Sequence, residues 1–142
     1  MNIGPNKDTI PEEVINDYLL CYEEVFEYAD FVTINISSPN TPNLRSLHNA
    51  ENFKAVIDAI LSERNRHQKK PKVFIKISPD EESKTYTNLI ETINNSAIDG
   101  VIISNTSNNQ NLKKSLNVAH LPGGISGKSL KNSCLLYTSD AA

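Results

Sequence analysis

Two cysteines, five glycines and a slight excess of acidic residues in a chain of 142 residues exclude several classes of protein. Cys21 and Cys134 form no C-x-x-C pair, so the sequence indicates neither a disulfide framework nor a zinc site. The glycines form no G-x-G-x-x-G, the loop that binds phosphates in dinucleotide-binding folds. A net charge of −3 without a basic patch argues against nucleic acid as a partner.

Long hydrophobic runs are also missing. No apolar stretch approaches the roughly 18 residues that a membrane-spanning helix needs, and no signal peptide is recognisable. The three histidines stand apart from one another, so no metal site is predicted. What remains is an ordinary soluble composition, 38% hydrophobic and 22% charged, in a chain long enough for one domain with a core.

Stretches rich in β-branched residues alternate along the chain with stretches of helical periodicity. The sequence predicts strands at 31–36, 72–77 and 101–103, with the end of another strand at 1–4. Apolar residues recur every three or four positions and predict helices in 14–26, 53–60 and 86–93. The charged run 63–70, after the second of these helices, is interpreted as a solvated loop.

This alternation predicts an α/β fold with a parallel sheet and helical crossovers. A (β/α)8 barrel needs roughly 250 residues, so about four consecutive βα units would form part of one. A small doubly wound sheet is the alternative. It predicts a glycine-rich phosphate loop after its first strand, and the sequence has none.

The most informative stretch runs from Phe31 to Leu47. Its first part is an apolar strand, and its second part is almost wholly polar, with Pro39 and Pro42 restricting the backbone. Parallel α/β enzymes build their sites from polar residues at the carboxyl ends of strands. The stretch therefore predicts part of an active site, although an ordinary turn rich in Asn, Pro and Ser would look similar.

Lys76 is the other unusual residue, because it stands in an otherwise apolar strand. A lysine there costs free energy unless it is paired, so we expect its ammonium to meet a ligand at the strand end. Polar residues also follow this strand, at 78–80, and the next one, at 104–109. Each predicted strand thus leads into polar residues.

Five groups of residues, spread along the chain, resemble the class 2, quinone-dependent dihydroorotate dehydrogenases. They are 2–7, 35–47, 75–80, 99–106 and 123–128. The resemblance implies a (β/α)8 TIM barrel with FMN lying across the carboxyl ends of its strands. It also implies oxidation of (S)-dihydroorotate to orotate in de novo pyrimidine (UMP) biosynthesis, with a quinone accepting the electrons.

By the same resemblance, Ser38 stands at the position of the catalytic base that removes the C5 proton while hydride leaves C6 for the flavin. Soluble class 1 members carry cysteine there, so the serine favours a quinone. The residues implied to bind the substrate are Asn35, Asn40, Asn105 and Thr106. The residues implied to bind FMN are Asn2, Asn35, Lys76, Ser104 and Gly127. Carboxamides suit a pyrimidine because each offers a donor and an acceptor without charge. The glycine run 123–127 could instead be a flexible loop.

The resemblance further implies that residues 1–131 are an incomplete FMN-binding barrel domain and that 132–142 are a tail outside the family pattern, of the kind that a truncated gene produces. A membrane-binding region would precede residue 1. It would place the protein peripherally on the cytoplasmic side of a bacterial inner membrane, or on the mitochondrial inner membrane. Two alternatives stay open: a catalytically inactive fragment that does not bind FMN by itself, and a class 1 type or other FMN-dependent pyrimidine oxidoreductase.

Overall fold

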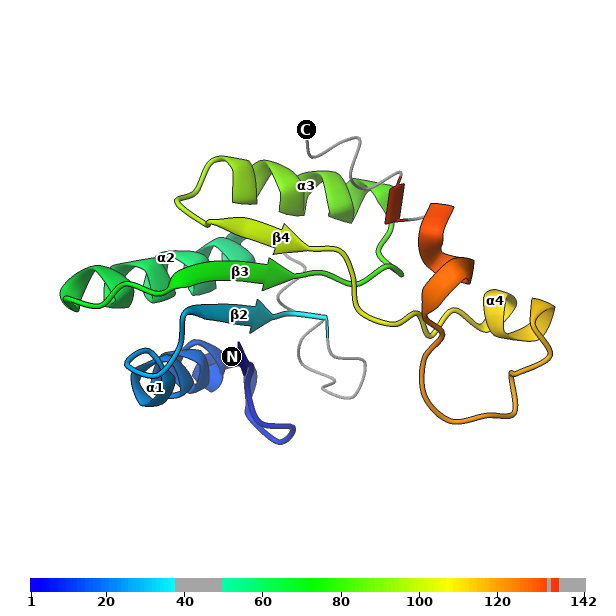
Figure 1. The fold of residues 1–142 in the computed structure, drawn as a ribbon, viewed down its shortest axis with the longest axis horizontal. Helices are drawn as coiled ribbons and strands as arrows, with labels where there is room; N and C mark the ends of the chain where they lie inside the picture. Colours follow the sequence, from blue (N-terminus) through cyan, green and yellow to red (C-terminus); the bar gives the residue numbers. More distant parts are fainter. Residues whose placement is uncertain (38–49, 133, 136–142) are drawn as a thin grey trace.

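The computed structural model describes residues 1–37, 50–132 and 134–135. Within them, strands alternate with helices along the chain (Figure 1). The strands are β1 (Asn2–Ile3), β2 (Phe31–Asn35), β3 (Lys72–Lys76) and β4 (Gly100–Ile102). The helices are α1 (Val14–Val25), α2 (Ala50–Arg66), α3 (Ser83–Asn94) and α4 (Gln110–Ser115), with short 3-10 helices at Pro11–Glu13 and Gly127–Leu130.

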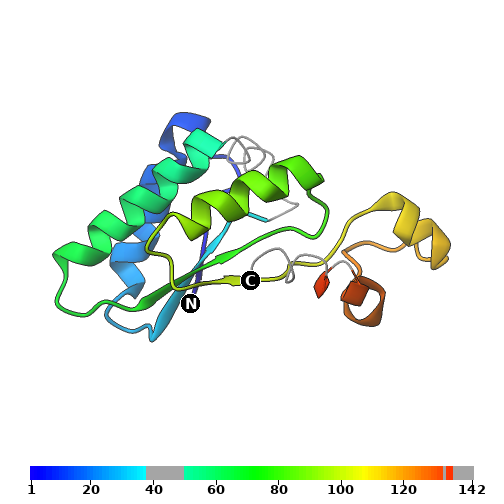
Figure 2. The ribbon, with the colours of Figure 1, turned by 90° about the horizontal axis from the view of Figure 1, so that it is seen from above.

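The four strands form one parallel sheet in the order β1-β2-β3-β4, which is also their order in the sequence. Helices α1, α2 and α3 all cover the same face of this sheet (Figure 2), and α2 packs between the other two. A doubly wound sheet would reverse its strand order and carry helices on both faces. Sequential order with helices on one face is instead the arrangement of consecutive βα units in a (β/α)8 barrel.

The core lies between the sheet and its helices. Alternate strand residues point into it and are almost fully buried: Val32, Ile34 and Ile36 near β2, and Val73, Ile75 and Ile77 near β3. The predicted helical stripes meet them from the other side: Tyr18 and Tyr22, then Phe53, Val56, Ile57 and Ile60, then Tyr86, Leu89, Ile90 and Ile93. The periodicities of two and 3.6 residues therefore selected the correct faces.

The opposite face of the sheet carries the other alternate residues. At its amino end Phe31 and Phe74 form an edge-to-face pair, with ring centroids 5.5 Å apart. Gly100 lies beside them, and a Cβ there would come within 2.8 Å of the Phe74 ring. The glycine thus lets β4 approach the aromatic side chain of its neighbour. Aromatic residues occupy the amino end of this face, and polar residues occupy its carboxyl end.

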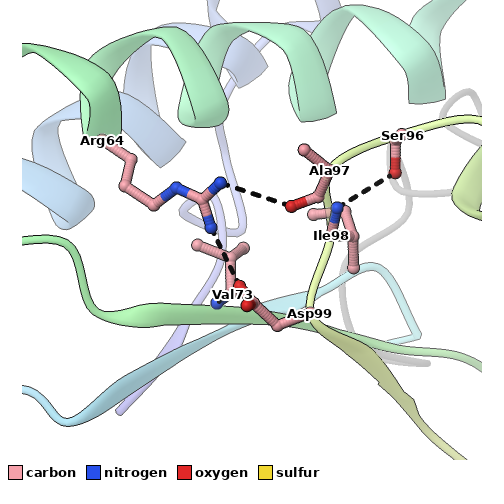
Figure 3. A network of polar contacts seen from close by, with 6 residues as sticks. All are labelled: Arg64, Val73, Ser96, Ala97, Ile98 and Asp99. Carbon is pink, nitrogen blue, oxygen red and sulfur yellow. Dashed lines mark hydrogen bonds and ion pairs between the residues drawn. The ribbon is translucent and has the colours of Figure 1, made fainter.

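A polar network ties the amino ends of the strands together (Figure 3). Arg64, in the last turn of α2, donates to Asp99 Oδ2 across 2.8 Å and to the carbonyl of Ala97 across 3.3 Å. The same Asp99 oxygen accepts the backbone N–H of Val73 at 2.8 Å. One carboxylate therefore joins α2, β3 and the segment that leads into β4.

The prediction of a solvated loop at 63–70 is wrong for its first half, because α2 continues to Arg66. Glu63 is only 8% exposed; it accepts a hydrogen bond from Arg66 at 2.8 Å and lies 2.9 Å from His67 Nε2. The His67 ring stacks on Phe26, the residue that follows α1, with ring centroids 3.8 Å apart. Charged residues three and four positions apart pair along a helix, so the charged run lengthens the helix.

None of the helices in the described part of the chain is long and apolar enough to cross a membrane. Figure 1 shows α4 and the residues after it beyond the arrowheads of the strands, at the carboxyl end of the sheet. This placement brings the glycine run of the sequence to the same end as the polar residues that follow each strand.

Candidate active site

The register of the sheet brings three of the predicted site residues to one face. Asn35 at the end of β2 is the direct register partner of Lys76 at the end of β3. Asn2 pairs with Thr33, two residues before Asn35. Paired residues of parallel strands share a face, as do residues two apart in a strand. Asn2, Asn35 and Lys76 therefore all lie on the face that the helices do not cover.

Lys76 is half-buried between the carboxyl ends of β2 and β4, opposite Ile102 in the register. Its neighbours Ile75 and Ile77 point to the other face, into the core. Its ammonium makes no hydrogen bond or ion pair with any residue in the described ranges. A cation without a partner on this face agrees with the expectation that it meets a ligand, which stays a prediction.

Asn35 is held at both its backbone and its side chain. The buried hydroxyl of Tyr18, from α1, donates to the Asn35 carbonyl across 2.9 Å. Burial raises the pKa of this phenol far above its ordinary value, so it stays a donor. Asn35 Oδ1 accepts from the Ser37 backbone N–H at 3.2 Å and from its hydroxyl at 2.9 Å. The amide nitrogen, Nδ2, has no partner in the described part of the structure.

Asn105, after β4, reaches the same place from far along the chain. Its Nδ2 donates to the Ser37 carbonyl across 2.9 Å and to the Ser37 hydroxyl across 3.2 Å, although 68 residues separate the two. Its backbone N–H donates to the carbonyl of Ile77, which anchors it to the end of β3. Asn35, Asn105 and the buried Ser37 therefore form one connected group at the ends of β2 and β4, anchored to the end of β3 through Ile77.

The glycine run packs against the residues that follow β4. Ser107 and Ile125 form a two-way backbone bridge, with hydrogen bonds of 2.9 and 2.8 Å. A Cβ on Gly124 would lie 2.3 Å from Thr106 Oγ1, so only glycine fits beside this threonine. This part of the run is therefore tied to the residues after β4 through Ile125, and the alternative of a flexible loop stays open for the rest of it.

Gly127 and Ser104 complete the described members of the predicted set. Gly127 has a φ of +77°, in the left-handed region that glycine tolerates, and a Cβ there would meet none of the described atoms within 4 Å. Ser104 is half-buried, and its hydroxyl donates to the carbonyl of Asn105 at 3.0 Å. The open space beside Gly127 agrees with a backbone that a ligand approaches closely.

Asp80 joins the loops after β3 and β4. Its carboxylate accepts the hydroxyl of Ser107 and the backbone N–H of Asn108, the latter at 2.6 Å. Ser107 is 1% exposed, so its end of this hydrogen bond is buried. The polar residues that follow the strands are thus connected to one another rather than separately solvated.

Two predicted residues, the base position Ser38 and the substrate residue Asn40, lie outside the described residues. Sequence reasoning missed two others that the structure brings into the site. Ser37 has a local signal, because it is the first hydroxyl after an apolar strand. Tyr18 has none, because it reads as one more member of the apolar stripe of α1.

Comparison with known proteins gives a consistent result. The family model for dihydroorotate dehydrogenase matches residues 1–138. The dihydroorotate dehydrogenase (quinone) of Polaromonas naphthalenivorans is 40% identical over 131 residues, which are 89% of this chain and 37% of that protein. The enzyme of the same name from Serratia proteamaculans is 40% identical over 137 residues, 94% of this chain and 41% of that one.

Two crystal structures of DHODH from Eimeria tenella, one ligand-free and one in complex with ferulenol, have the same fold. Their TM-scores are 0.85 and 0.86 at 30% identity, covering 97% and 99% of this chain but 42% and 41% of theirs. The chain therefore spans about two fifths of the proteins it matches. The predictions of family and fold class are confirmed: the chain belongs to the dihydroorotate dehydrogenase family, and its parallel sheet is part of a (β/α)8 barrel.

Proposed function

We propose that the full-length protein containing these residues oxidises (S)-dihydroorotate to orotate in de novo pyrimidine biosynthesis and passes the electrons to a quinone. The observation that carries this proposal is the match of the family model to 138 consecutive residues, with relatives named for quinone at 40% identity. The arrangement of carboxamides and a lysine at the carboxyl edge supports it. A class 1 type enzyme is disfavoured by serine at position 38.

Dihydroorotate dehydrogenases are flavin-dependent, and the described residues fit FMN. Within the described residues, the Lys76 ammonium and the Asn35 amide nitrogen have no partner; the two residues are register partners, and there is open space beside Gly127. We assign these three residues, with Asn2 and Ser104, to the cofactor. FMN would supply the acceptor for the substrate hydride, and a nearby cation is the group that stabilises a reduced, anionic flavin.

The substrate side is assigned to Asn35, Asn40, Asn105 and Thr106, with Ser38 as the base. The carboxamides would hold the pyrimidine edge, and Ser38 would take the C5 proton. A free serine is a weak base, so this role needs a site from which water is excluded. A quinone as electron acceptor places the protein at a membrane surface, and we assign that contact to a region outside these residues. Residues 1–131 would be the FMN-binding segment, and 132–142 would take no part in it.

The activity test uses the full-length protein under anaerobic conditions. Dihydroorotate should bleach the flavin absorbance, and a quinone should restore it faster than a water-soluble acceptor does. Ser38→Ala should slow flavin reduction by at least about 10²-fold, the usual scale for a lost general base, with little change in orotate affinity. Reduction of Ser38→Ala at the unaltered rate would remove this residue from the mechanism. Absence of any bleaching in the unmodified protein would refute the proposed function.

The isolated chain of 142 residues is expected to behave differently, because it spans only 37–41% of its curated relatives. We propose that it does not retain FMN by itself. Gel filtration of the purified chain, followed by its visible spectrum, checks this. A yellow protein peak with a flavin absorbance band would show that these residues suffice for binding.

A further inference from the structure

Ser37 occupies the centre of the candidate site without a role of its own in the proposed chemistry. It is 8% exposed, and its backbone N–H, carbonyl and hydroxyl all bond to side chains of the site. Two of these bonds go to Asn35 on one side and two to Asn105 on the other. Because every polar group of this buried serine is hydrogen-bonded to one of two carboxamides, it can determine the orientation of both.

The polarity of the bonds fixes that orientation. A backbone N–H can only donate, so the group of Asn35 that faces Ser37 must be its oxygen. The amide nitrogen of Asn35 then points away from Ser37, and neither of its hydrogens is bonded to a residue that the structure describes. A backbone carbonyl can only accept, so the group of Asn105 that faces Ser37 must be its nitrogen. The backbone N–H of Thr106 donates to the Asn105 oxygen at 2.9 Å and fixes the same orientation from the other end.

We propose that Ser37 is a positioning residue that holds Asn35 with its amide N–H groups toward the ligand. Asn35 then offers two donors, and it favours a ligand that presents a carbonyl or carboxylate oxygen at this point over one that presents an N–H. This inference rests on the proposed function and adds to it, because orotate and dihydroorotate carry such oxygens. It also sets Asn35 apart from Asn105, whose nitrogen is already engaged.

The reverse orientation of Asn35 is disfavoured by the same contacts. Turning the carboxamide over would place an NH2 group against the Ser37 N–H, so the backbone hydrogen bond would be lost and the Ser37 hydroxyl would have to turn from donor to acceptor. Removing the Ser37 hydroxyl leaves only the longer backbone bond of 3.2 Å to hold Asn35. Asn105 is less affected, because its shorter bond, 2.9 Å, goes to the Ser37 carbonyl. The hydroxyl therefore acts mainly through Asn35.

The test is a double-mutant cycle in the full-length, FMN-loaded protein, with the orotate dissociation constant measured from the flavin difference spectrum. Ser37→Ala should weaken orotate binding about tenfold, the scale of one lost hydrogen bond. In an Asn35→Ala background the same change should have less than about a twofold effect, because the group it positions is gone. A tenfold loss in both backgrounds would show a general packing role, and no loss in either would overturn the proposal.

Two controls keep the result interpretable. Ser96 is matched to Ser37, because its hydroxyl donates to Ile93 and accepts from Ile98 at the opposite end of the sheet, so Ser96→Ala should leave orotate affinity unchanged. Ser37→Cys replaces the hydroxyl with a slightly larger and weaker donor, so it should also weaken orotate binding about tenfold; it is the test to use if Ser37→Ala does not fold.

The same cycle measured on stability separates this inference from the proposed function. If the unmodified protein does not bind orotate, the proposed function fails. Urea unfolding still reports whether Ser37 and Asn35 are coupled, with an expected coupling of about five- to tenfold in the unfolding equilibrium constant. Additive effects of the two substitutions on unfolding would show that Ser37 does not hold Asn35, and would overturn the inference without reference to the ligand.

Discussion

Arg64 and Asp99, 35 residues apart, meet through a charged hydrogen bond of 2.8 Å at the amino end of the sheet. The arginine is 15% exposed and the aspartate 31%, so the pair is shielded more than a typical surface ion pair. The Asp99 carboxylate also accepts a hydrogen bond from the backbone N–H of Val73. The contact lies at the opposite end of the strands from the candidate site, where side chains in barrel enzymes serve stability.

We therefore expect Arg64→Met to destabilise the full-length protein by about 1–3 kcal/mol, the range for hydrogen bonds to charged groups. The flavin content and the orotate affinity should not change. Urea unfolding measures the loss. Lys54→Met is the matched control, because Lys54 and Asp58 form an ion pair whose side chains are 64% and 57% exposed, and such pairs contribute little. Equal losses of stability in the two variants would show that the Arg64–Asp99 contact contributes no more than an exposed ion pair.

The second prediction concerns how the stability of the protein depends on pH. Asp17 accepts the hydroxyl of Thr9 and the backbone N–H of Asn6, the latter at 2.9 Å, and these bonds lower its pKa below the ordinary value. A carboxyl whose pKa is lower in the folded state stabilises the protein above its unfolded pKa, about 3.9. That contribution disappears as the pH falls through the folded pKa.

The stability of the unmodified protein should therefore exceed that of Asp17→Asn at pH 7, and the difference should shrink as the pH falls below about 4. Urea unfolding at a series of pH values measures both curves. Two parallel curves would mean that the Thr9 and Asn6 contacts do not depend on the charge of Asp17.

The third prediction tests the assignment of Lys76 to the flavin. Lys76→Met keeps a similar volume and removes the ammonium, so the strand should stay packed. Loss of a charged interaction of about 1–3 kcal/mol should lower the two-electron reduction potential of the flavin by some tens of millivolts. Redox titration against a reference dye measures it.

Lys72→Met is the control for this experiment. Lys72 lies on the same strand and by alternation on the same face, but it is exposed at the amino end, opposite Phe31. Its substitution should leave the potential where it was. An unchanged potential in Lys76→Met, at normal FMN content, would place the ammonium in solvent.

The fourth prediction concerns Gly124. A methyl group there would lie 2.3 Å from Thr106 Oγ1 and 2.6 Å from its Cβ, so either the loop or the threonine must move. Gly124→Ala should destabilise the protein by about 1–3 kcal/mol, the usual effect of overpacking, and weaken orotate binding through Thr106. Ser126→Ala, an exposed residue of the same loop, is the control and should change neither quantity. Unchanged orotate affinity in Gly124→Ala would remove Thr106 from the substrate contacts.

Much of the fold could be predicted from the sequence, because hydrophobic periodicity is a local property. The stripe of Tyr18 and Tyr22 and the alternation through Val73 and Ile75 identified the buried faces correctly. The family followed from residues that lie close together in the chain, such as those from Asn35 onward. Local patterns misled at Glu63, because the charged residues of a helix that pair with one another look like a solvated loop in the sequence.

The tertiary structure decided the relations between segments that are distant in the sequence. Strand order and register cannot be read from any one strand, yet they place Asn35 beside Lys76 on the helix-free face. Two of the four hydrogen bonds that hold Ser37 come from Asn105, 68 residues away. Residue types and their periods therefore determined which elements form and which faces they bury. Only the packing of the sheet determined which polar groups meet, because that depends on long-range contacts that no local pattern encodes.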